Sequence, residues 1–434
     1  MHGKTGDQLT ESFMQYTLGL LLLHILFSSC LFLLIMHFVF HGTKLHDLAL
    51  NAWDSGWYET IAIRGYTHSP GEQSSVAFFS LFPLMWKLLG ADRLQIALVN
   101  LLLYGTGLLL LAKKWRVRPA EFLLLVATPA LFFCYVPYSE ALFFLLSVLF
   151  MVGLKDQRLT LAIPALLLAG MVRSVAFVFI PVFLFMTFLQ NREVPRSTNR
   201  TLNRFLLFSL VSLMSLVLTF AIHKMYTGYW FGLFETQKTW GRVFSWPHFP
   251  LRVNSTTNGF ELFWLDGSAY LMGLMSGLFC LLWYIQKQQG NEVIKDDATL
   301  FSFAYLSMIL LVTMLYSPVD VQGTRIYSLS RLFLCGPYYM LFILYFLRRR
   351  STLSLFFLQI IVFIFGVLCF AYTYTESIFD LLTMVVPMFV YFCYTISGFY
   401  RLKRPFRTTL PVYATLVYLQ IYLLIYFLQN NWVS

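Results

Sequence analysis

Long apolar runs recur along the whole chain, and short clusters of Lys and Arg separate many of them. A run of about 20 apolar residues is long enough to cross the hydrocarbon core of a bilayer as a helix. Backbone polar groups inside that core must be satisfied within the protein, so helices are the expected form. The pattern therefore predicts an all-α polytopic membrane protein.

The composition favours the same class. Of the 434 residues, 59% are hydrophobic and only 12% are charged, whereas soluble domains carry about 25% charged residues. The net charge of +11 invites a nucleic-acid interpretation. The basic residues lie between apolar runs, however, as the positive-inside rule requires. We therefore expect membrane lipids and no nucleic acid as partners.

Hydropathy and basic clusters together predict one domain over residues 1–434, with about 11–13 crossings and a cytoplasmic N-terminus. The expected outer loops are 41–93, 226–266 and 317–330. Residues 77–86 are apolar but short, and they predict an interfacial or re-entrant helix. The expected crossings are residues 16–40, 94–112, 119–135, 138–154, 159–171, 174–190, 205–225, 267–286, 299–316, 331–347, 353–373, 378–399 and 409–429.

The first outer loop places an acid among aromatic residues. With a helical period, Trp53, Trp57 and Tyr58 share one arc, and Asp54 lies within it. A carboxylate on the apolar face of an interfacial helix costs free energy unless it is paired or used. Asp54 is therefore a candidate catalytic residue, with a cap or salt bridge as the alternative. Asp47, one heptad earlier, is the second candidate.

This loop and the following spans carry a resemblance to a known family. Trp53-Asp54, Gly65-Tyr66 and the stretch from Glu72 to Pro83 resemble the first lumenal loop of the GPI mannosyltransferase II (PIG-V) family and its bacterial relatives. Residues 138–143 and the turn at Arg173 are also similar to motifs of that family. The resemblance covers roughly the first 180 residues, and it extends to the wider GT-C class of glycosyltransferases.

The resemblance implies a GT-C-type helical bundle that moves a hexose, with the mannose of the family name as the first candidate, between lipid-linked molecules. The donor would be a polyprenyl-phosphate or dolichyl-phosphate sugar, and the acceptor a lipid-linked or other glycan hydroxyl at the outer face. Inverting transfer needs a base to take the proton of that hydroxyl, and Asp54 fits this role. A monophosphate donor implies no metal and no other cofactor, and the sequence holds no DxD or HExxH signature.

Several cations are candidates for the donor phosphate, because a guanidinium matches phosphate geometry. Arg173 is expected either to bind phosphate or to pair with Glu140, which itself begins a span or contacts substrate. Arg64 is expected either to pair with Asp54 or to face phosphate. Arg331 follows the third outer loop, where a surface-anchoring role is the default and contact with phosphate from across the bundle is the alternative.

Other polar and aromatic residues of the outer loops suit a sugar. Each has an ordinary alternative: helix capping for the Glu72 region, and an interfacial aromatic belt for the tryptophans. The complete set of candidate donor- and substrate-binding residues is Trp53, Tyr58, Arg64, Glu72, Gln73, Glu140, Arg173, Gln237, Trp240, Arg242 and Arg331.

Two other function classes remain open. A transporter or flippase would show broken helices and an inverted repeat, and no repeat is visible. A glycan polymerase or ligase would have its key arginines in a later outer loop. An accessory membrane subunit is a further expected partner. Ser80 and the pattern of loop 226–266 depart from the eukaryotic family, which favours a bacterial plasma membrane over the ER membrane.

Overall fold

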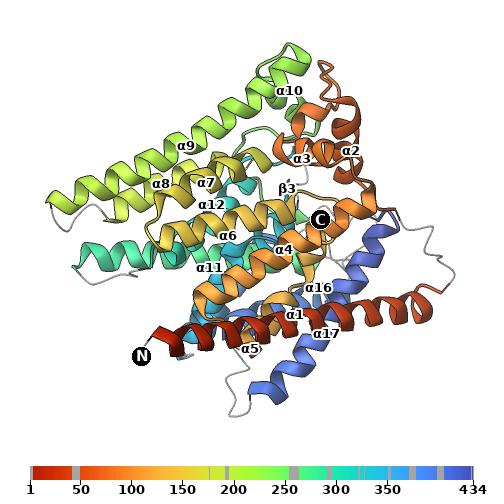
Figure 1. Cartoon of the computed structure of the whole chain (residues 1–434). Coiled ribbons are helices and arrows are strands. Elements are labelled where there is room, and N and C mark those ends of the chain that lie inside the picture. Colours follow the sequence, from red (N-terminus) through yellow and green to blue (C-terminus); the bar gives the residue numbers. More distant parts are fainter. Residues whose placement is uncertain are drawn as a thin grey trace.

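The computed structural model describes residues 3–41, 49–174, 176–190, 195–253, 263–290, 296–320, 323–326, 328–349, 353–370, 378–397, 405–431 and 433. Helices dominate it, and many of them run along one another (Figure 1). The α-helices are α1 (Gly3–Phe38), α2 (Asp54–Arg64), α3 (Leu81–Leu89), α4 (Arg93–Trp115), α5 (Pro119–Val126), α6 (Glu140–Lys155), α7 (Leu159–Val172), α8 (Ala176–Gln190), α9 (Pro195–Thr227), α10 (Gly232–Thr239), α11 (Phe263–Gln288), α12 (Asp297–Leu315), α13 (Leu329–Leu334), α14 (Pro337–Arg348), α15 (Leu353–Phe370), α16 (Ile378–Ser397) and α17 (Pro405–Leu428).

Within the described residues, 6 helices are long and apolar enough to cross a membrane. They comprise Phe13–Phe38, Arg93–Trp115, Leu202–Thr227, Phe263–Gln288, Asp297–Leu315 and Thr409–Leu428. Shorter apolar helices accompany them, including the two at Leu159–Val172 and Phe177–Leu189. The chain is therefore a multi-span helical membrane protein, as its hydropathy predicts.

The expected crossing at 119–135 is wrong as a continuous helix. It is α5 followed by the 3₁₀ helix η3 (Pro129–Cys134). Pro129 lacks an N–H, and the residue before a proline avoids the α conformation. The Gln420 amide of α17 donates to the Val126 and Thr128 carbonyls, at 3.2 and 2.9 Å. Those hydrogen bonds satisfy backbone groups that the break exposes.

The expected crossing at 331–347 is also divided, into α13 and α14. Pro337 begins α14 directly after Gly336. A proline at the first helical position is favourable because its missing N–H would have had no helical partner. The break separates Arg331 from the 12-residue α14 and leaves it on the short α13, near the outer loop.

A small sheet joins two outer loops, which the all-α expectation did not include. Its strands are β1 (Leu251–Val253), β2 (Val319–Asp320) and β3 (Gly323–Ile326). β1 pairs in parallel with β3, and β2 pairs antiparallel with β3. Loop 226–266 is therefore tied to loop 317–330 beside the start of α13.

The first outer loop folds into helices at one end of the bundle. The 3₁₀ helix η2 (Ser75–Ala77) and α3 form where the sequence predicts an interfacial or re-entrant segment. α2 packs against α3, and α10 packs against η2. Figure 1 shows α2, α3 and α10 gathered together at this end, above the tips of the long helices. We call it the loop end of the bundle.

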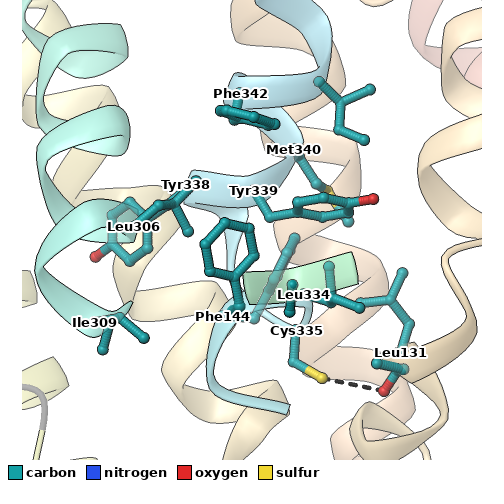
Figure 2. Packing of buried hydrophobic residues seen from close by; sticks show 14 of the residues in the cluster. Leu131, Phe144, Leu306, Ile309, Leu334, Cys335, Tyr338, Tyr339, Met340 and Phe342 are labelled. Carbon is teal, nitrogen blue, oxygen red and sulfur yellow. Dashed lines mark hydrogen bonds between the residues drawn. The ribbon is translucent and has the colours of Figure 1, made fainter. Parts of the chain in front are cut away.

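Aromatic residues fill the space beneath the loop end. Tyr338 of α14 packs against Tyr305 of α12, with 4.1 Å between ring centroids. Figure 2 shows Phe144 and Leu306 beside Tyr338, and it shows Cys335 directed toward η3. The Cys335 thiol lies 3.0 Å from the Ala130 carbonyl. This packing fixes the α13–α14 junction, and so the backbone on which Arg331 is mounted.

Asn100 of α4 is a buried polar group that holds the segment before α6 in place. Its amide nitrogen donates to the Val136 and Tyr138 carbonyls, at 2.6 and 2.8 Å. We predict that Asn100→Ala lowers the free energy of unfolding by about 1–3 kcal/mol, because it leaves a buried carbonyl without a donor. Thermal unfolding in detergent measures this. Leu98→Ala, at an exposed position of the same helix, is the control, and an equal loss in both variants would contradict the role of Asn100.

Candidate functional site: a buried charge cluster at the loop end

Asp54 is held at the start of α2 by an unusual turn. The preceding residue, Trp53, has a φ of 54°, a conformation that non-glycine residues rarely adopt and that the surroundings must enforce. The Tyr138 hydroxyl accepts from the Asp54 N–H at 3.2 Å and donates to the Ala52 carbonyl at 3.3 Å. The Ser55 hydroxyl closes the turn on the Leu50 carbonyl at 2.7 Å. These contacts fix the Asp54 backbone while its side chain stays 25% exposed.

Arg331 comes from the other half of the chain to meet Asp54. Its Nη1 donates to Asp54 Oδ2 at 2.5 Å. Its guanidinium lies over the rings of Tyr138 and Phe133, 4.4 and 5.3 Å from their centroids. The side chain is only 7% exposed, so the expectation of a surface-anchoring Arg331 is wrong. Because the guanidinium is buried, water screens the attraction between these two charges less than it does in a surface pair.

Glu140 is the buried anion at the centre of the cluster. Its Oε1 accepts from Arg331 Nε and from Arg173 Nη1. The expected Glu140–Arg173 ion pair is therefore present, and Glu140 begins α6, as its place at the outer end of an apolar run predicts. Glu140 Oε2 is buried and has no hydrogen-bond partner in the described part of the chain. We call Asp54, Glu140, Arg173 and Arg331 the charge cluster. The negative charges of its two carboxylates balance the positive charges of its two guanidiniums.

Opposing effects act on the pKa of Arg331. Burial lowers it, but the charges of Glu140 and Asp54 raise the pKa well above its ordinary value. The guanidinium is therefore always charged, and its position beside two carboxylates depends on their remaining ionised.

Tyr58 adds a hydroxyl beside the cluster. It donates to the Ser139 hydroxyl at 3.0 Å, next to Glu140 in the sequence. Burial, and then the negative charges of Asp54 and Glu140, raise the pKa of Tyr58 to about 12. The phenol therefore keeps its proton at neutral pH and acts as a hydrogen-bond donor.

An aromatic group borders α2 on the side of the second outer loop. Trp57 stacks on Phe78 with 5.8 Å between centroids, and Trp240 meets Trp57 edge-on at 6.4 Å. Gln237 lies at the end of α10, where its side-chain oxygen is 3.5 Å from Arg242 Nη1. The structure thus brings Trp240 of loop 226–266 to the helix that carries Asp54, and it pairs Gln237 with Arg242 on the same loop.

Other predicted residues lie apart from the cluster. Arg64 is exposed at the far end of α2, about 15 Å along the helix axis from Asp54, so the expected Arg64–Asp54 pair is wrong. Glu72 and Gln73 are exposed in the turn before η2. The Trp53 side chain is 40% exposed. Asp47 lies outside the described residues.

Sequence reasoning missed the residue that positions Arg331. Asp266, in the first turn of α11, accepts from the Ser330 N–H at 2.6 Å, one residue before Arg331. The sequence signal that could have identified Asp266 is an acidic residue at the edge of an apolar run. Asp266 lies one residue before the expected crossing at 267–286 and was therefore not considered. Among the described residues, no group of three or more His, Cys, Asp or Glu is arranged to hold a metal ion.

No family model, curated protein or solved structure matches this chain.

Removing the central anion tests the charge cluster. We predict that Glu140→Gln lowers the free energy of unfolding by about 3–5 kcal/mol, because it leaves buried guanidiniums without their shared carboxylate. Adding Arg173→Met to Glu140→Gln should recover part of that loss, since the unpaired cation is then gone. Equilibrium unfolding of the single and double variants measures the coupling between the two residues.

The exposed pair of Glu59 and Arg93, at 2.7 Å, supplies the control for that cycle. Glu59→Gln should cost at most about 1 kcal/mol, as surface ion pairs usually do. Equal losses for Glu59→Gln and Glu140→Gln would show that the charge cluster carries no special weight.

Proposed function

We propose that the protein is a glycosyltransferase of GT-C type that moves a hexose, with mannose the first candidate, from a polyprenyl-phosphate or dolichyl-phosphate donor. The acceptor is a hydroxyl of a lipid-linked or other glycan at the outer face of the membrane. The observation that carries the proposal is the contact between a partly exposed Asp54 and a buried Arg331, at the loop end of a membrane-spanning bundle. This contact supports the proposal because a carboxylate that can accept a proton lies next to a guanidinium, a group that suits phosphate.

The proposed reaction is a single displacement with inversion. The acceptor oxygen forms a bond to the anomeric carbon as Asp54 takes the hydroxyl proton. The bond between that carbon and the phosphate oxygen breaks, and the electron pair leaves with the polyprenyl phosphate. Negative charge grows on the phosphate in this step, and fixed guanidiniums stabilise it. Arg331 and Arg173 are the proposed donors to the phosphate.

The ion pair between Arg331 and Asp54 gives phosphate binding a second role in this scheme. The Asp54 oxygen that accepts from Arg331 is occupied by this ion pair, and it must be released before it can take the acceptor proton. A donor phosphate that reaches Arg331 competes with Asp54 for the same N–H groups. Asp54 is the more exposed partner, so it is the one that moves. Glu140 stays buried and keeps both arginines in position.

The aromatic group and the second outer loop supply the proposed acceptor side. Trp57 follows Asp54 by three residues on α2, and its ring meets Trp240 of the second outer loop edge-on. Rings of this kind pack on the apolar faces of sugars, and the nearby Gln237 and Arg242 can bind hydroxyls. The membrane is proposed to be a bacterial plasma membrane, or the ER membrane in a eukaryotic host. An accessory membrane subunit remains a proposed partner.

The first test is transfer by purified, detergent-solubilised protein from polyprenyl-phosphate mannose to mixed membrane glycolipids. We predict that the wild type adds one hexose and that Asp54→Asn loses about 10²-fold or more in rate, because the amide cannot accept the proton. Mass spectrometry of the products measures both.

Glu59→Gln, on the same helix but paired with Arg93, is the control and should retain activity within about threefold, as expected for a surface pair. Equal activity in wild type and Asp54→Asn would assign the base elsewhere. No transfer by any variant, from intact donor, would favour a lipid transporter or flippase. Extension of a glycan by many units would favour a polymerase.

Arg331→Lys separates charge from shape. Lysine keeps the positive charge but lacks the planar fork that binds phosphate through two N–H groups. We predict a fall of about 10- to 100-fold in kcat/KM for the donor, the value of one charged hydrogen bond, with KM for the acceptor unchanged. Initial rates at varied donor and acceptor concentrations measure this. A change confined to the acceptor KM would contradict the assignment of Arg331 to phosphate.

A further inference from the structure

A long apolar groove runs between α1, α4 and α17. Its volume is about 660 Å³, within the range of ligand pockets. Its lining extends from Leu18 to Leu33 on α1 and from Leu94 to Leu109 on α4, which is about 22 Å along each helix. Leu98 and Leu102 of its wall are more than half exposed, so the groove is open toward the surrounding lipid. This shape fits one extended hydrocarbon chain.

Polar groups lie partway along the groove, where surrounding hydrocarbon offers them no hydrogen-bond partner. The Ser28 hydroxyl and the Tyr104 phenol both line it, are at least nine-tenths buried, and have no hydrogen-bond partner in the described residues. His24 also lines it and is bonded to the Tyr413 and Tyr135 hydroxyls, at 2.9 and 3.4 Å. Unpaired hydroxyls in a bilayer are costly, so they point to an occupant that accepts weak hydrogen bonds.

One end of the groove adjoins the candidate site. Leu50 lines that end and is joined through its carbonyl to Ser55, the residue after Asp54. Val136 lines it two residues before Tyr138. Phe427, next to the lining residue Leu428, packs edge-on against the Tyr138 ring at 5.5 Å. Tyr138 in turn lies beneath Arg331. A chain in the groove therefore ends near the charge cluster.

We infer that this groove holds the isoprenoid tail of a polyprenyl phosphate, an inference that rests on the proposed function. The phosphate of such a lipid is attached directly to its chain, so a phosphate near the charge cluster brings the tail to the groove without a glycerol spacer. The chain carries regularly spaced double bonds, whose π faces accept weak hydrogen bonds from hydroxyls such as those of Ser28 and Tyr104. A saturated chain offers those hydroxyls no acceptor.

The test is photo-crosslinking of the purified full chain with a polyprenyl phosphate that carries a diazirine on its tail. We expect labelled peptides from α1 and α4, and competition by unlabelled polyprenyl phosphate but not by a saturated diacyl phospholipid. Leu102→Trp narrows the groove from an exposed position and should reduce this labelling about tenfold, since added volume in a fitted site is poorly tolerated. Leu210→Trp, at an exposed position of α9, should leave it unchanged.

A second pair of variants tests the hydroxyls without filling the groove. Ser28→Ala with Tyr104→Phe should remove the preference of the wild type for the unsaturated over the fully saturated chain, with thermal stability retained. Labelling on other helices, or equal competition by the diacyl phospholipid, would overturn the inference. If Leu102→Trp transfers the hexose as fast as the wild type, the groove assignment is rejected and the proposed function stands. If the groove is labelled but the wild type transfers no hexose, the proposed function is rejected and the groove assignment stands.

Discussion

A buried ion pair between distant segments is the constraint on which the loop end depends. Arg331 of α13 binds Asp54 of α2 and Glu140 of α6, and Glu140 also binds Arg173 after α7. Removing two charges of each sign from water costs several kcal/mol per ion unless they are well paired. The surrounding structure must therefore hold four chain segments in register. The turn at Trp53, the hydrogen bond from Ser330 to Asp266 and the broken helix before α14 all serve that register.

Such a cluster is weak support for stability alone, because well-packed apolar residues would often serve as well. Its asymmetry is more informative. Glu140 is enclosed, whereas Asp54 reaches solvent, so one carboxylate is fixed and the other is free to change partners. In the proposed enzyme the two carboxylates therefore have different roles. Glu140 holds the arginines in position, and Asp54 leaves its ion pair and takes the acceptor proton. The neighbouring apolar groove would extend the same site from the charged headgroup to the lipid tail.

Prolines in two apolar segments decide where the charge cluster can form. A continuous helix over 119–135 or 331–347 would satisfy the bilayer more simply. Pro129 and Pro337 divide those segments instead. One break creates η3, whose Phe133 ring supports Arg331; the other leaves Arg331 on a helix of its own. Irregular backbone at this depth is tolerated where neighbouring side chains such as Gln420 satisfy it.

Hydropathy alone determined the class of the fold, because a bilayer permits few alternatives to apolar helices. Asp54 and Arg173 were candidates because a charge beside apolar runs is costly unless it is paired or used, and Glu140 was a candidate as the expected partner of Arg173. Only the tertiary structure decided that Arg331, and not Arg64, forms the ion pair with Asp54. An ion pair between residues 277 positions apart leaves no periodic pattern in a sequence. The three-stranded sheet and the role of Asp266 were hidden for the same reason: each is a contact between loops or helix ends whose partners lie far apart in the chain.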